Sequence, residues 1–247
     1  MKINANFRLF AATNFDATKY IASPAYGVNR FMLDRIGDEK ARATTIVEYS
    51  ANSKFPQHTH IGGEEFLVLL GTFKDHYGEF PAVTYVRNPI GSEHAPWVDE
   101  DGCTILVKLL QMAETEGEGQ EPLHVNVEKE KGTRGKPEEY GTVLDLYSNQ
   151  YTGEHVEMCW IDPGKEFPSN EKSLAGGEEL FVVNGSLLLD SEQPIYEKWG
   201  WLRFPPGGPN DNHRSNLKAG PQGAQVYRKT GHLSEEAMKK EKIQITE

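Results

Sequence analysis

Residues 55–71 read FPQHTHIGGEEFLVLLG, and residues 167–185 read FPSNEKSLAGGEELFVVNG. Both share the frame FP…GGEE followed by four or five apolar residues and a glycine, and the second has two extra residues before GGEE. Three flanking pairs match in the same order: TTIVEYSANSKFP with VEMCWIDPGKEFP, YVRNPIGSEHAP with WLRFPPGGPNDN, and TILVKLL with AQVYRKT. Four matches in one order indicate an internal duplication, so we predict two copies of one β-rich domain.

The apolar runs within each copy are short, rich in β-branched and aromatic residues, and separated by turns such as DHYGEFP and NPIGS. No stretch of about 12 residues with helical periodicity separates them, which disfavours an α/β fold. Antiparallel strands of this kind bury one face by closing into a sandwich, jelly roll or barrel. The predicted fold class is all-β, with two jelly-roll barrels in one chain.

The repeat also predicts the domain boundaries. We place the first domain at residues 1–112 and the second at residues 140–233. Residues 113–139 are charged and contain Gly and Pro, with LHVNV as a strand candidate. They are expected to form a linker or crossover that could lend an edge strand to one barrel. We expect residues 234–247 to be a tail with a short exposed helix.

Composition limits the function classes. The 247 residues are 37% apolar, which favours a packed core, and their net charge of −11 argues against nucleic-acid binding. The start MKINANFRLF lacks signal-peptide features, and no apolar run approaches the ~18–20 residues of a membrane span. Cys103 and Cys159 form neither a disulfide framework nor a CxxC motif. We expect both to be buried thiols, and the protein to be cytoplasmic.

Four residues of the first copy are predicted metal ligands. His58 and His60 are two residues apart, so they point to the same face of a strand. Glu64 follows a Gly-Gly pair, which allows the chain to reverse and bring the next strand alongside. His94 follows a tight turn that presents an imidazole from another strand. Three imidazoles and one carboxylate suit one divalent transition metal, with Zn favoured and Fe, Ni or Mn as alternatives.

Other residues near these ligands have weaker signals. Tyr85 and Arg87 lie on the strand that leads to the last imidazole, and pocket, core and surface roles stay open for both. Glu65 should face the opposite side of its strand from Glu64, towards supporting groups or solvent. His76 lies in a predicted turn and is expected to be exposed. No catalytic residue is predicted.

The second copy keeps the repeat frame without the ligands. It reads SNEK where the first copy has its two histidines, and Asn210 stands at the position of His94. Glu178 persists, and His213 lies three residues too late in the alignment. A protonated lysine cannot coordinate, and one carboxylate with one amide makes a poor transition-metal site. We therefore expect no metal in the second copy. Of the two roles left for its barrel, we favour packing against the first barrel over binding a small molecule.

With these motifs, the chain resembles a double cupin. The first cupin motif, G(X)5HXH(X)3–4E(X)6G, is met at four positions, which are His58, His60, Glu64 and Gly71. The second motif, G(X)5PXG(X)2H(X)3N, is met at three positions, which are Pro89, Gly91 and His94. The departures are an absent opening glycine, where Asn52 and Ser53 stand, and Val83 and Val98 in place of a glycine and an asparagine. These are turn and packing positions, so the metal ligands are unaffected.

The sequence from about Gly27 to Gln111 resembles the cupin domain of ChrR-type anti-sigma factors, and residues 141–233 resemble it more weakly. The resemblance implies a zinc-holding domain that acts as a stress or small-molecule sensor. In that family a separate helical domain with a His/Cys zinc site binds the sigma factor. Only about 25–40 residues precede the first cupin here, without a cysteine, so sigma-factor binding is not expected.

Enzymes are the alternative function class. Cupins similar to this one include diketone-cleaving dioxygenases, which implies a metal-dependent dioxygenase acting on a small chelating substrate. Three histidines would then hold the metal, and open coordination positions would take the substrate and dioxygen. The expected partners are a small molecule and, through pairing of cupin edges, a second copy of the chain.

Overall fold

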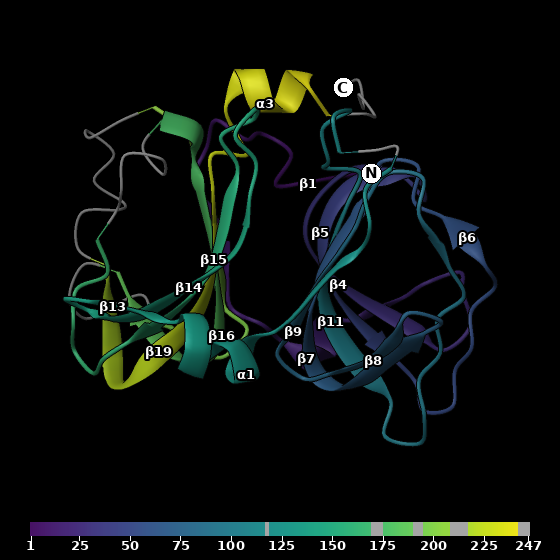
Figure 1. Cartoon of the computed structure of the whole chain (residues 1–247), viewed down its shortest axis with the longest axis horizontal. Helices are drawn as coiled ribbons and strands as arrows, with labels where there is room; N and C mark the ends of the chain where they lie inside the picture. Colours follow the sequence, from purple (N-terminus) through teal and green to yellow (C-terminus); the bar gives the residue numbers. More distant parts are fainter. Residues whose placement is uncertain (117–118, 169–174, 190–194, 208–216, 242–247) are drawn as a thin grey trace. The chain divides into compact units, whose positions relative to one another are not determined.

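The computed structural model describes residues 1–116, 119–168, 175–189, 195–207 and 217–241. The chain divides into two compact units. The first unit contains residues 1–5 and 16–128, with Lys240 and Glu241, and the second contains residues 6–15 and 129–239. Both units are built mainly of antiparallel strands (Figure 1), so the predicted all-β fold class is confirmed.

The first unit contains a nine-stranded sheet and a separate two-stranded ribbon. Its strands are β1 (Lys2–Ile3), β3 (Ile21–Ala22), β4 (Val28–Gly37), β5 (Ala41–Tyr49), β6 (His58–Thr59), β7 (Glu64–Asp75), β8 (Gly78–Pro81), β9 (Thr84–Asn88), β10 (Glu93–His94), β11 (Cys103–Leu109) and β12 (Leu123–Asn126), and a 3-10 helix, η1 (Ala17–Lys19), precedes β3. The sheet order is β1-β4-β5-β11-β7-β9-β12, with β3 beside β4 and β8 beside β7. Strands β6 and β10 form the ribbon.

The second unit contains an eight-stranded sheet. Its strands are β2 (Ala11–Thr13), β13 (Lys136–Glu138), β14 (Gly141–Ser148), β15 (His155–Ile161), β16 (Glu178–Leu188), β17 (Ile195–Tyr196), β18 (Trp201–Phe204) and β19 (Lys218–Thr230). The sheet order is β13-β14-β15-β19-β16-β18-β2, with β17 beside β16.

The strand orders confirm the duplication. The order β4-β5-β11-β7-β9 of the first unit recurs as β14-β15-β19-β16-β18 in the second. The glycine that ends the repeat frame is equivalent in both: Gly71 has φ +73° and Gly185 has φ +77°. A Cβ atom at either position would come within 2.2 or 2.1 Å of a carbonyl oxygen on the facing chain. Only glycine fits this conformation and this close approach, which explains its place in the repeat.

The edge strand of the second unit comes from a part of the chain that we expected in the first domain. Strand β12, from the LHVNV segment, pairs with β9 and so supplies the edge strand that the sequence suggested. In the second unit the same place is taken by β2, whose residues 11–13 we expected in the first domain. A three-residue strand is too short to show periodicity, so its destination was not visible in the sequence.

Two short helices, α1 and α3, are described over their full length. Helix α1 (Val127–Arg134) lies in the segment expected to be a linker, and α3 (Glu235–Lys239) lies in the predicted tail helix. The Ser234 hydroxyl caps α3 by accepting a hydrogen bond from the Ala237 N–H at 3.0 Å. Among the described residues, no helix has the length and apolar character needed to cross a membrane.

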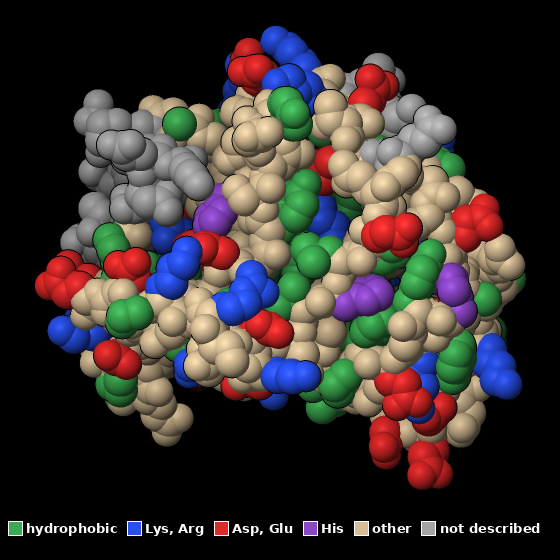
Figure 2. Space-filling model, in the orientation of Figure 1, with side chains coloured by type: hydrophobic (Ala, Val, Ile, Leu, Met, Phe, Trp, Pro, Cys, Tyr) green, Lys and Arg blue, Asp and Glu red, His purple; other side chains and the backbone are tan. Residues whose placement is uncertain are grey.

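Each unit has its own apolar core. The first core includes Val47, Phe66, Val68, Phe73, Val86, Ile105 and Val107, and the second includes Val143, Phe167, Leu180, Val182, Leu202 and Val226. Cys103 and Cys159 belong to these cores, as predicted, and both are free thiols. Burial raises the pKa of Cys103 to about 12, so it stays protonated. On the visible surface, acidic and basic side chains are interspersed (Figure 2).

Candidate metal centre

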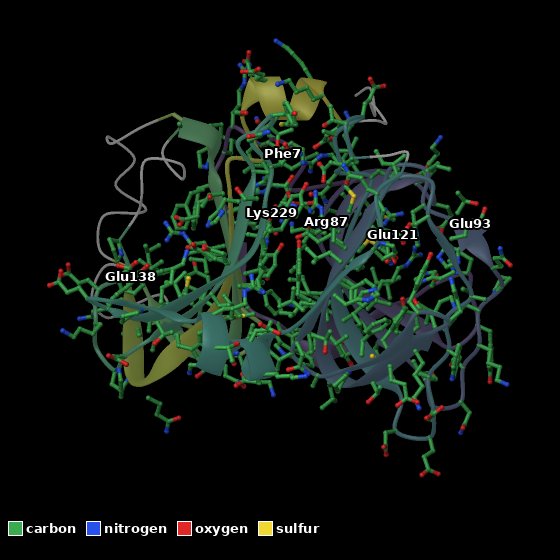
Figure 3. All side chains as sticks on the ribbon, in the orientation of Figure 1. Phe7, Arg87, Glu93, Glu121, Glu138 and Lys229 are labelled. Atoms are coloured by element: carbon green, nitrogen blue, oxygen red, sulfur yellow. The ribbon has the colours of Figure 1, made fainter. Side chains whose placement is uncertain are left out.

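The β6–β10 ribbon carries three of the four predicted ligands. The two strands pair antiparallel, with His94 opposite His58 and Glu93 opposite Thr59. His60 follows β6 directly, and its backbone N–H donates to the Ser92 carbonyl at 2.9 Å. Strand β6 is set apart from β4, β5 and β11 (Figure 1), and Glu93 lies beside it (Figure 3). The histidines are therefore presented by a separate ribbon of the first barrel.

Glu64 begins β7, and its carboxylate reaches the three imidazoles. One potential ligand atom from each of His58, His60, Glu64 and His94 lies within 4.8 Å of the others. His60 Nε2 is 3.2 Å from His94 Nε2. Glu64 Oε2 is 3.3 Å from His60 Nε2 and 3.6 Å from His94 Nε2. The structure thus brings together all four residues singled out in the sequence.

Hydrogen bonds fix the tautomers of His58 and His60. His58 Nδ1 is 3.1 Å from the Pro56 carbonyl oxygen, which can only accept, so this nitrogen carries the hydrogen. His60 Nδ1 is 2.9 Å from the Ser92 hydroxyl, which donates its own hydrogen to the Pro89 carbonyl at 2.7 Å and therefore accepts from the imidazole. Each neutral ring is left with a lone pair on Nε2.

Asp75 fixes the tautomer of His94. Its Oδ2 accepts from His94 Nδ1 at 2.9 Å, and its Oδ1 accepts from the Tyr77 N–H at 2.7 Å. The side chain is fully buried at the end of β7. Sequence analysis missed Asp75, because an aspartate before a turn is common for local reasons and gives no sign of burial. A carboxylate that orients a ligating imidazole and raises its basicity is frequent in metal sites.

The site is arranged for a cation. The converging atoms, imidazole Nε2 lone pairs and a carboxylate oxygen, are all hydrogen-bond acceptors, and none of them carries a hydrogen to donate to another. Such an arrangement is unfavourable unless a positive ion lies between the atoms. Burial alone would raise the pKa of Glu64, whereas a 3.0 Å hydrogen bond from Asn88 lowers it and favours the ionised carboxylate. Burial also lowers the pKa of His58, so its ring favours the neutral form. The residues present therefore fit a divalent transition metal.

The residues proposed for the pocket lie elsewhere. On β9, Asn88 faces the metal-site carboxylate, so Arg87 and Tyr85 lie on the opposite face by alternation. Arg87, labelled in Figure 3, forms buried ion pairs with Glu65 and Glu116, and its Nε lies 3.0 Å from Glu116 Oε2. Glu65 faces away from the site as expected, but it is buried in this ion pair instead of reaching solvent. Tyr85 and Arg87 are both buried, on the face of β9 opposite Asn88.

The second unit pairs its retained carboxylate with an arginine. Glu178 is buried, and its Oε1 lies 2.6 Å from Arg228 Nε. Asn210 and His213 lie outside the described residues. A different group of metal-type ligands occurs in this unit, formed by Asp145, His155 and Glu157. Sequence spacing does not reveal this group, because Asp145 reaches His155 across a hairpin.

Asp75→Asn is expected to lower the Zn²⁺ affinity of the first site by about 10–100-fold. The amide oxygen can still accept the hydrogen bond of His94, but the negative charge that strengthens the imidazole as a ligand is lost. A competition titration with a chromophoric chelator measures the affinity. Asp99→Asn, at an exposed position of the same unit, is the matched control. An affinity equal to that of the control would contradict the role of Asp75.

Comparisons with known proteins agree with this geometry. The family model described as the ChrR cupin-like domain matches residues 10–113. No curated protein matches the chain.

Three solved structures illustrate the similarity of fold. YlbA from E. coli is 17% identical, with TM-score 0.60 and coverage of 91% of this chain and 92% of its own. The bacterial pirin YhhW in complex with nickel(II), also from E. coli, is 12% identical, with TM-score 0.59 and coverage of 90% and 98%. A salicylate 1,2-dioxygenase variant from Pseudoaminobacter salicylatoxidans is 12% identical, with TM-score 0.52 and coverage of 76% and 69%.

At these identities the structures show a shared fold and not a shared activity. The sequence match is independent of them and covers the part of the chain that holds the four converging ligands. Residues 10–113 therefore match the ChrR cupin-like domain, in a chain whose two barrels both have the cupin fold.

Proposed function

We propose that the first barrel binds one divalent transition metal through three imidazole Nε2 atoms and the Glu64 carboxylate, and that the protein is a metal-dependent sensor or small-molecule-binding protein of the ChrR cupin-like type. The convergence of hydrogen-free ligand atoms, each oriented by its own neighbour, carries this proposal. Zn²⁺ is the proposed ion because it favours nitrogen and oxygen ligands in small coordination numbers. Fe, Ni and Mn are the alternatives.

The position of the site supports a sensing or binding role. His60, Glu64 and His94 are buried, whereas His58 is exposed. A small molecule can therefore approach the ion from the side of His58, which a purely structural metal would not require. Two buried free thiols suit a reducing compartment, so we include a cytoplasmic location in the proposal.

A metal-dependent dioxygenase is the second candidate function. The same exposed side of the site would allow a chelating substrate, such as a diketone, to bind an ion held by the histidines. In this case an Fe(II) ion would supply the dioxygen chemistry, and the protein residues would hold and orient the ion.

Elemental analysis followed by oxygen uptake distinguishes these functions. We expect protein expressed without added metal to contain a stoichiometric transition metal. The apoprotein is then loaded with Fe(II) or, as a control, Zn²⁺, and oxygen consumption is followed with candidate diketones. Uptake with Fe(II) alone would support the dioxygenase, and its absence would support the sensor. No stoichiometric metal would contradict both functions.

The affinity of the site for Zn²⁺ is expected to fall as the pH is lowered. A protonated imidazole cannot coordinate, so protons compete with the ion. Because burial lowers the pKa of His58, this ring is neutral at neutral pH and is protonated only under more acidic conditions. We expect little change between about pH 8 and 7 and a steep fall below about pH 6. Competition titrations across this range measure the affinity, and a constant value would argue against imidazole ligands.

A further inference from the structure

The second unit contains a compact group of one imidazole and two carboxylates. Asp145 on β14 lies opposite Glu157 on β15, and His155 is two residues before Glu157 on the same face. His155 Nε2 is 3.2 Å from Asp145 Oδ1 and 3.1 Å from Glu157 Oε2. One potential ligand atom from each residue lies within 4.8 Å of the other two. The three side chains come from a single β-hairpin of the barrel.

The other oxygen of each carboxylate is held by a cationic side chain. Asp145 Oδ2 forms an ion pair with Lys136, and Glu157 Oε1 lies 3.1 Å from Arg228 Nη1. Asp145 Oδ1 and Glu157 Oε2 are thereby directed towards the imidazole, as outer partners direct ligands in metal sites.

Two buried polar atoms beside this group have no hydrogen-bond partner among the described residues. They are His155 Nδ1 and Thr230 Oγ1, and Thr230 is only 1% exposed. Thr230 lies opposite His155 in the β15–β19 register, so both side chains are on one face. Buried polar atoms are rarely left unpaired, and water bound to an ion at this group could pair with the Thr230 hydroxyl.

One guanidinium beside the group is shared between two carboxylates. Glu178 pairs with the same guanidinium as Glu157. The Asp145 side chain is 37% exposed, which gives an ion access from solvent.

We propose that Asp145, His155 and Glu157 bind a second divalent metal ion, at positions unrelated to those of the first site. One nitrogen and two carboxylate oxygens suit Zn²⁺ or Mn²⁺. Neighbouring ligands around an ion with bonds of about 2.1 Å lie roughly 3.0–3.4 Å apart, and the observed separations of 3.1 and 3.2 Å agree with this. This site does not depend on the function proposed for the first barrel.

Zinc stoichiometry of the full-length chain tests the proposal. The protein is stripped with a chelator, loaded with Zn²⁺ and freed of unbound ion by gel filtration, and zinc per chain is measured. We expect two ions in the wild type. One ion should remain in the double variant His58→Ala/His94→Ala and one in His155→Ala, and none when all three are combined. A wild-type count that His155→Ala does not lower would overturn the second site.

The same variants separate the two proposals. If only the first-site variant loses zinc, the function proposed for the first barrel stands and the second site is refuted. If only His155→Ala loses zinc, the second site stands and the metal site proposed for the first barrel is refuted. Should His155→Ala fail to fold, as judged by circular dichroism, Asp145→Asn decides, because it keeps the side-chain shape at a partly exposed position. It should remove one ion, whereas Asp162→Asn, at an exposed position of the same unit, should remove none.

Discussion

Replacing His94 with alanine is expected to remove one equivalent of transition metal per chain. His94 is the most buried of the four ligands, at 1% exposure, and Asp75 holds its ring in the ligating tautomer. Its loss leaves two imidazoles, one of them exposed, and one carboxylate. Because changing only an outer partner of a ligand costs 10–100-fold in affinity, loss of the ligand itself should cost at least about 100-fold.

Metal content after gel filtration measures this effect, with the free ion kept below micromolar concentration. His76→Ala is the matched control, because His76 is an exposed histidine in the turn that follows β7, as the sequence predicted. The control should retain the wild-type metal content and the wild-type circular dichroism spectrum. Equal metal content in the two variants would show that the ion, if present, does not lie between the β6–β10 ribbon and β7.

The ligands of the first site could be predicted because each depends on local geometry. The alternation of strand residues places His58 and His60 on one face, and a glycine turn returns the chain at Glu64. The turn before His94 similarly fixes the start of β10. Such relations extend over a few residues, so sequence spacing is enough to reveal them.

Residues whose role depends on distant partners could not be predicted in this way. Asp75 meets His94 only because β7 passes the ribbon, and β2 joins a sheet formed by residues far along the chain. The second glutamate of GGEE is a clearer case. Glu65 lies opposite Arg87 in the first unit, and Glu179 lies opposite Arg203 in the second. The repeat therefore preserves a cross-strand pair, which becomes recognisable only when the register is known.

Arg228→Met is expected to lower the free energy of unfolding by about 3–5 kcal/mol. In the first unit the equivalent position, opposite Phe66 on β7, is the core residue Val107. In the second unit Arg228 lies opposite Leu180, and its guanidinium pairs with Glu178 and Glu157. Burial would lower the pKa of this arginine, but the two carboxylates raise it. Its removal leaves two buried carboxylates without their main counter-ion.

Urea denaturation in the presence of a chelator measures this loss without a contribution from bound metal. Arg134→Met is the matched control, because its pair with Glu130 is half exposed and should contribute at most about 1 kcal/mol. The double variant Arg228→Val/Glu178→Gln should recover part of the loss, since it removes a buried negative charge together with its partner. If Arg228→Met were as stable as the control, the Arg228 guanidinium would not be the group that neutralises the Glu178 carboxylate. A recovery in the double variant would show that Arg228 and Glu178 stabilise the second unit as a pair.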